Sequence, residues 1–97
     1  MVVTLAEFTS SVSKAAPPEN LAPPLAALWW AANGDWDTAH KLVQDDAGRD
    51  AAWVHAYLHR VEGDLPNARY WYRAARKPEA AGALEAEWAA ITAALLT

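Results

Sequence analysis

The feature that most constrains the fold is a short break at Gly63 and Asp64, between two segments with helical patterns of apolar residues. Gly63 can adopt the left-handed conformation that ends a helix without steric cost. Asp64 can then cap the next helix by accepting a hydrogen bond from a free N–H of its first turn, where Pro66 is also tolerated. Because the connection is so short, a helix ending near Glu62 and a helix beginning near Leu65 must pack as an antiparallel hairpin.

The same pair of residues occurs earlier in the chain, at Gly34 and Asp35, 29 residues before Gly63. The segments that follow, GDWDTAHKLVQ and GDLPNARYWYR, align without a gap. The alignment matches Ala27 with Ala56, Ala39 with Ala68, and Trp30 with His59. A repeat of about 30 residues is typical of arrays of helix hairpins. We therefore predict two hairpins, with helices over about 24–33, 36–45, 51–62 and 65–77, and with Asp50 as the cap of the helix over 51–62.

The remaining segments flank these hairpins. Thr4 can cap a first helix, and four prolines keep the residues after it extended. A last helix, over about 79–96, should cover the exposed face of the second hairpin through an apolar stripe at Leu84, Trp88, Ile91 and Leu95. The chain is thus predicted to be a single all-α domain over residues 1–97, with an N-terminal helix (1–14), a Pro-rich linker (15–24) and a helical-repeat core (25–97). The N-terminal helix either closes the first hairpin or crosses to a second copy in a homodimer, and the sequence leaves both open.

Composition also favours an all-α chain. Hydrophobic residues make up 54% of the 97 residues, and alanine dominates among them, which is typical of closely packed helices. The sequence has no cysteine, so it excludes disulfides and thiolate metal ligands. It has neither the pattern of a secretory signal nor a segment with the length of a membrane span. A net charge of −4 disfavours binding to the phosphates of nucleic acid. We therefore expect a cytoplasmic protein without nucleic-acid or membrane partners.

The second hairpin carries a pattern of small and aromatic residues. Small residues at Ala56, Ala68 and Ala75, the Gly63–Asp64 turn, and the aromatic Tyr72 recur in this order. The pattern resembles the tetratricopeptide repeat and its relative, the Sel1-like repeat. The chain departs from that family at His55 and His59, where the repeat has a core Leu and a core Tyr, and at Trp53, one position after the family's Trp. The resemblance implies a helical scaffold that presents a binding groove, and no particular reaction.

Two histidines and a glutamate share one arc of the same predicted helix: His55, His59 and Glu62, at i, i+4 and i+7. This spacing could place two imidazoles and a carboxylate around a zinc or iron ion, which makes a metal-dependent enzyme the alternative function. The arc offers no separate third or fourth ligand. We therefore predict a polar binding role with no metal and no cofactor. At least one of the histidines should bond to a carboxylate, with Glu62 nearest in sequence and Asp64 or His40 available across the hairpin.

A neighbouring edge of that helix carries Trp53, Tyr57 and Arg60. By the repeat resemblance this edge lines the concave surface, and aromatic residues with arginine are those that anchor peptides and ligands. Trp53 and Tyr57 could instead be core residues beneath the first or the last helix, and the sequence leaves this open. We favour a non-enzymatic interaction or ligand-binding module without catalytic residues. Its protein, peptide or small-molecule partner would contact this edge and the histidine arc beside it.

Overall fold

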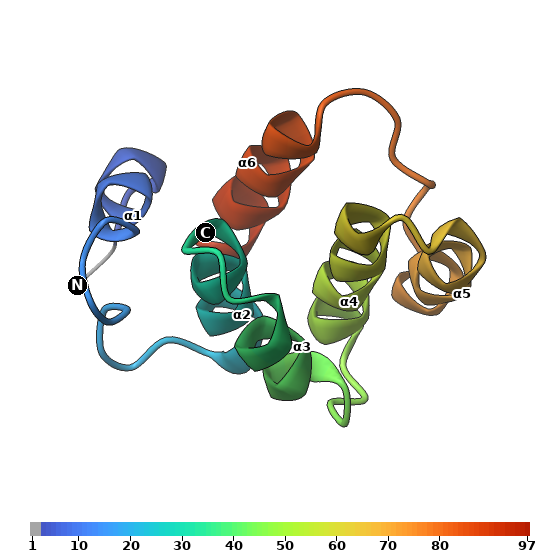
Figure 1. Cartoon of the computed structure of the whole chain (residues 1–97), viewed down its shortest axis with the longest axis horizontal. Helices are drawn as coiled ribbons and strands as arrows, with labels where there is room; N and C mark the ends of the chain where they lie inside the picture. The colour runs from blue at the N-terminus through green and yellow to red at the C-terminus, as the bar shows by residue number, and fades with distance from the viewer. Residues whose placement is uncertain (1–2) are drawn as a thin grey trace.

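The computed structural model describes residues 3–97, and these residues form six helices and no strand (Figure 1). The helices are α1 (Leu5–Ser11), α2 (Pro23–Ala32), α3 (Trp36–Val43), α4 (Arg49–Glu62), α5 (Leu65–Ala75) and α6 (Leu84–Leu95). The all-α class predicted from composition and apolar patterning is therefore confirmed. Within this described range, each helix is too short or too polar to cross a lipid bilayer.

Helices α2 and α3 pack against each other across one tight turn, and α4 and α5 pack across another (Figure 1). Gly34 and Gly63 have positive φ angles of 93° and 87°, so both turns use the left-handed conformation that glycine accepts without strain. Asp35 and Asp64 each accept a hydrogen bond from the backbone N–H three residues later, at 3.1 and 3.3 Å, and so cap α3 and α5. The two Gly-Asp breaks therefore have the same geometry.

Two helices begin at residues other than those predicted. α4 begins at Arg49, so Asp50 lies inside its first turn, where a negative charge is favourable, and does not cap the helix. α6 begins at Leu84 rather than near residue 79. Gly82, with a φ of 90°, interrupts the backbone just before α6 and leaves the connection from α5 irregular. Both differences arise in the loops, where a short stretch of sequence admits several caps.

Helix α6 lies across α2 and α4, the first helices of both pairs, and closes the core (Figure 1). The prediction placed it on the second hairpin alone, so its contact surface is wider than expected. Ile91 and Trp88 are 0% and 8% exposed, and Nε1 of Trp88 donates a hydrogen bond to the carbonyl oxygen of Leu28 in α2 at 2.8 Å. α6 thereby covers much of the face on which the repeat resemblance places a binding groove.

Helix α1 packs on α6 and α2 of the same chain. Phe8 is fully buried, and its ring centroid lies 5.9 Å from that of Trp88. Nε1 of Trp29 donates a hydrogen bond to the hydroxyl of Ser11 at 3.1 Å. α1 is shorter than predicted, since the chain enters a tightened turn directly after Ser11. The N-terminal segment thus closes the first helix pair, and a homodimer stays a prediction.

Candidate functional site

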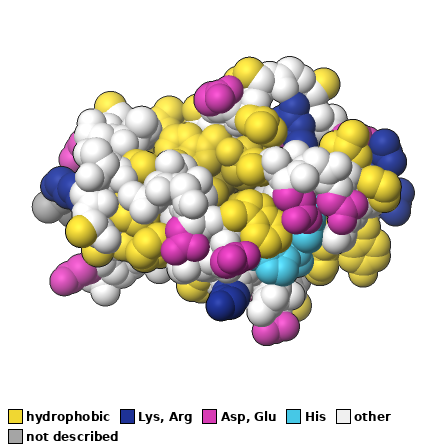
Figure 2. Space-filling view, in the orientation of Figure 1, with side chains coloured by type: hydrophobic (Ala, Val, Ile, Leu, Met, Phe, Trp, Pro, Cys, Tyr) yellow, Lys and Arg dark blue, Asp and Glu magenta, His cyan; other side chains and the backbone are white. Residues whose placement is uncertain are grey.

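All three histidines of the chain meet where α3, α4 and α5 adjoin, with His40 from α3 and with His55 and His59 from α4. Each offers one ring nitrogen, and these three atoms lie within 4.8 Å of one another. His55 and His59 are 4% and 6% exposed, whereas His40 is only partly buried. Figure 2 shows histidine side chains reaching the surface beside acidic and hydrophobic side chains. These residues are called the three-histidine cluster below.

Helical spacing and helix packing together form the cluster. His55 and His59 lie one turn apart, so their rings stack with centroids 4.8 Å apart and an interplanar angle of 29°. His40 lies in the last turn of α3, which packs against α4. Its ring meets those of His55 and His59 edge-on, with centroids 4.7 and 5.2 Å away. The third imidazole, absent from the arc on α4, therefore comes from the neighbouring helix pair.

Two tryptophans hold the imidazole rings in place. Trp36, one turn before His40, stacks on its ring with centroids 4.7 Å apart and an angle of 10°. Trp71 of α5 stacks on His55 with centroids 4.0 Å apart and an angle of 18°. Nε1 of Trp36 donates a hydrogen bond to the carbonyl oxygen of Leu58 at 2.7 Å, which fixes the indole against α4. These flat contacts restrict rotation of the imidazoles, so the nitrogens are preorganised.

The polar atoms of the cluster are only partly satisfied. Nε2 of His55 lies 3.0 Å from Nε2 of His40, so one of the two nitrogens donates a proton to the other. Nδ1 of His55 is buried and has no hydrogen-bond partner among residues 3–97. A buried polar atom without a partner costs about 1–3 kcal/mol. Apolar side chains would fill the same space without this cost, so packing alone does not explain the cluster.

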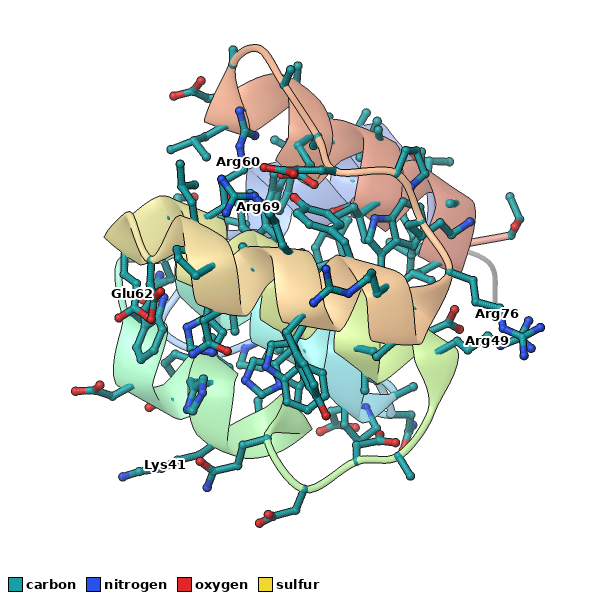
Figure 3. The ribbon with its side chains drawn as sticks, turned by 90° about the vertical axis from the view of Figure 1, so that its right-hand side faces the viewer. Lys41, Arg49, Arg60, Glu62, Arg69 and Arg76 are labelled. Atoms are coloured by element: carbon teal, nitrogen blue, oxygen red, sulfur yellow. The ribbon has the colours of Figure 1, made fainter. Side chains whose placement is uncertain are left out.

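A carboxylate orients the third imidazole. Nδ1 of His59 is hydrogen-bonded to Oε1 of Glu62 at 2.5 Å, which confirms the prediction that at least one of the α4 histidines bonds to a carboxylate. Because this bond occupies Nδ1, Nε2 is the ring nitrogen of His59 that remains available to bind another group. Asp64 has a carboxylate oxygen within 4.8 Å of the donor atoms of His59 and Glu62, but its side chain caps α5. Glu62 is labelled in Figure 3, at the same end of the α4–α5 pair as the turn.

The environment keeps two of the imidazoles neutral. Burial, together with smaller contributions from repulsion by His59 and His40, lowers the pKa of His55 from 6.5 to about 4. Burial also lowers the pKa of His40, and His59 adds to this effect while Glu62 opposes it. Both groups are therefore uncharged at neutral pH. Neutral imidazole is the form that binds a metal ion.

The donor set fits a small transition-metal cation. In a tetrahedral zinc site, bonds of about 2.0–2.1 Å place the ligand nitrogens about 3.3 Å apart. The distance of 3.0 Å between the Nε2 atoms of His40 and His55 is close to this value. Because all three ring nitrogens lie within 4.8 Å of one another, only small side-chain movements are needed to bring them to zinc-binding distances. Imidazole favours zinc, copper, nickel or iron over magnesium and calcium, which prefer oxygen ligands. Three protein ligands leave a coordination position open.

The second predicted edge, Trp53, Tyr57 and Arg60, faces α6. Tyr57 is 7% exposed, and burial together with the charge of Glu87 raises its pKa to about 12. Arg60 donates hydrogen bonds to Glu87 of α6 at 3.0 Å and to the carbonyl oxygen of Gly82, and Figure 3 shows it reaching toward this part of the chain. Tyr57 and Arg60 thus help to hold α6, whereas Trp53 borders an open hollow. A binding role for this edge stays a prediction.

Several members of the site are not visible in the arc on α4. A signal for His40 does exist in the sequence, because Trp36 and His40 lie one turn apart on a short helix and must share a face. No comparable signal connects Trp71 with His55, since they belong to different helices. The partner of Arg60, Glu87, was also missed. It lies in an alanine-rich segment, where an acidic residue ordinarily faces water, yet it is 9% exposed.

Comparison with known proteins gives no match: no family model, curated protein or solved structure corresponds to this chain. The function is therefore argued from the chemistry of the three-histidine cluster and its surroundings.

Proposed function

We propose that this chain is a small, cytoplasmic, non-enzymatic binding module whose ligand is a divalent transition-metal ion, with zinc as the first candidate, in place of the metal-free polar role predicted from the arc on α4. Its scaffold would be a pair of helix hairpins related to tetratricopeptide and Sel1-like repeats. The observation that carries the proposal is the convergence of three imidazole nitrogens within 4.8 Å. The chain has no cysteine, so thiolate ligands are excluded and no oxidising compartment is needed for disulfides.

The state of each imidazole supports metal binding. His40 and His55 have lowered pKa values, so protons compete weakly with a metal ion at neutral pH. His59 is oriented by the carboxylate of Glu62, an arrangement that recurs behind metal-bound histidines and raises their basicity. The stacked tryptophans limit ring motion, which lowers the entropy lost on binding.

A purely structural role accounts for the cluster less well. Apolar residues would fill the same space without polar atoms to satisfy, whereas Nδ1 of His55 is buried without a partner among the described residues. A metal-dependent enzyme is the alternative and would use the same nitrogens, with water in the open position. Binding without catalysis is favoured because Glu62 is already bonded to His59 and is not free to act as a base.

Zinc titration of protein made without a histidine tag and stripped with a chelator tests the proposal. Calorimetry should give one site per chain, and cobalt(II) in place of zinc should give the visible absorption bands of a low-coordinate site. His40→Ala should weaken zinc binding by more than about 100-fold, because a lost ligand costs more than a lost residue that only orients one. Glu62→Gln should weaken it by about 10–100-fold.

Gln44→Ala is the matched control, because Gln44 lies one turn after His40 and is exposed. This variant should bind zinc as the native chain does. The proposal fails if the stripped native protein takes up no zinc, or if His40→Ala retains native affinity. The native chain could bind zinc and His40→Ala could lose that binding, while the cobalt-loaded chain shows no visible absorption bands. That combination would contradict the low-coordinate geometry.

A further inference from the structure

A hollow of about 320 Å³ lies between Trp53 of α4, the connection after α5, and α6. Pockets that hold small organic ligands measure roughly 300–1,000 Å³, so this hollow is large enough for one. Small side chains make much of its wall, including Ala86 and Ala90, which lie one turn apart on α6. The lining contains no histidine from the described chain, so the hollow is independent of the three-histidine cluster.

The interior of the hollow presents little free charge. The acidic residue in its wall, Glu87, is 9% exposed. Its Oε1 pairs with Arg60 at 3.0 Å, and its Oε2 accepts a hydrogen bond from the hydroxyl of Tyr72. Both carboxylate oxygens are therefore occupied within the protein, and the charge is compensated by the guanidinium. What remains toward the hollow is mainly the surface of alanines and the Trp53 ring.

The ammonium group of a lysine lies at the edge of this apolar surface. Nζ of Lys77 lies over the Trp53 ring, 4.3 Å from its centroid. Lys77 is exposed and takes no part in the ion pairs formed by the described residues. An ammonium group beside an apolar hollow is placed to meet an anionic head group whose apolar body lies inside.

More positive charge lies at the same end of the α4–α5 pair. Arg49 begins α4, one turn before Trp53, and Arg76 directly precedes Lys77. Figure 3 shows Arg49 and Arg76 extending from this end of the molecule. Asp50, in the same turn as Arg49, offsets one of these charges. Asp45 and Asp46 also lie in the loop just before α4, so the adjacent residues Arg76 and Lys77 are the cations that remain to attract an anion.

We infer that this hollow binds a small amphipathic carboxylate. The apolar body lies against Ala86, Ala90 and the Trp53 ring, and the carboxylate pairs with Lys77. The ligand beside Trp53 would thus be a small molecule rather than a protein, because the hollow is bounded by α6 and does not continue along α4. A neutral molecule of the same shape would bury the same apolar surface but would lack the ion pair.

Octanoate and its neutral counterpart octanol are suitable probes for titration into the full chain, followed by calorimetry and amide chemical shifts. The shifts should concentrate on α6 near Ala86 and on the connection near Lys77. Octanoate should bind about fivefold more tightly than octanol, as expected for one partly exposed ion pair. Lys77→Gln should abolish this preference, so that octanoate binds no more tightly than octanol. Lys41→Gln removes an exposed lysine of α3 and should retain the preference.

A second variant tests the hollow itself. Ala86→Leu combined with Ala90→Leu should fill it and abolish binding of both probes. Both alanines are exposed, so the larger side chains need not disturb the core, and circular dichroism checks the fold. Ala93→Leu is the control, because Ala93 is exposed on the same helix but does not line the hollow.

The inference is overturned if octanoate does not bind the native chain, if it binds no more tightly than octanol, or if the folded double variant binds as the native chain does. If the double variant does not fold, the Lys77→Gln comparison decides alone. A preference that survives Lys77→Gln overturns the assignment of the head group.

Discussion

Acid should destabilise the metal-free chain through His55. His55 is 4% exposed and is stacked by Trp71, and burial is the main cause that lowers its pKa from 6.5 to about 4. In the unfolded chain the same imidazole titrates near its ordinary value of about 6.5. The two states therefore bind different numbers of protons over the interval between these pKa values.

The sign of the effect follows from this difference. Between pH 6.5 and about 4, the unfolded chain is protonated at His55 and the folded chain is not, so the free energy of unfolding decreases as the pH falls. Above pH 6.5 the contribution is constant, and below about 4 both states are protonated. At about 1.4 kcal/mol for each pKa unit, the fall from 6.5 to about 4 amounts to about 3 kcal/mol. This is a large part of the roughly 5–15 kcal/mol that stabilises a typical domain.

Urea unfolding followed by tryptophan fluorescence, in the presence of chelator and between about pH 7.5 and pH 4.5, measures the effect. His55→Leu is the comparison, because it keeps an apolar side chain against Trp71 and removes the titrating group. Carboxylates contribute to both curves and cancel in the difference. Because this window ends above the folded pKa of about 4, the variant should lose about 2–3 kcal/mol less than the native chain. If the two curves run parallel, burial does not hold His55 neutral and the reasoning is refuted.

Two further predictions concern the fold. Gly34→Ala and Gly63→Ala should each lower the free energy of unfolding by about 1 kcal/mol, because alanine would have to adopt the left-handed conformation. Thermal unfolding measures the stability of both variants. If only one of the two substitutions lowers it, the two Gly-Asp turns are not equivalent. Glu87→Gln should cost about 3 kcal/mol in denaturant unfolding, since it leaves the largely buried Arg60 without its charged partner. Glu79→Gln, which removes an exposed ion pair, should cost less than about 1 kcal/mol, and equal losses would argue against a buried role for Glu87.

Local features of this chain follow from the sequence because they depend on residues a few positions apart. The Gly-Asp turns are an example, since a glycine with positive φ and an aspartate that caps three residues ahead need no other part of the molecule. The hydrogen bond between His59 and Glu62 belongs to the same class, because helical spacing alone brings the two side chains together. The start of α6 was predicted too early, since the backbone conformation of Gly82 is one of several that a flexible connection allows.

The composition of the three-histidine cluster was decided by the tertiary structure. The sequence places His55 and His59 on one arc, but His40 joins them only because α3 packs against α4. The sequence left open whether the edge with Tyr57 and Arg60 lines a groove or lies beneath a helix, and the position of α6 makes these two residues internal contacts. Helical periodicity determines which side chains share a face. Which faces meet depends on the summed packing of many apolar side chains from distant segments, and no local pattern of residues encodes that sum.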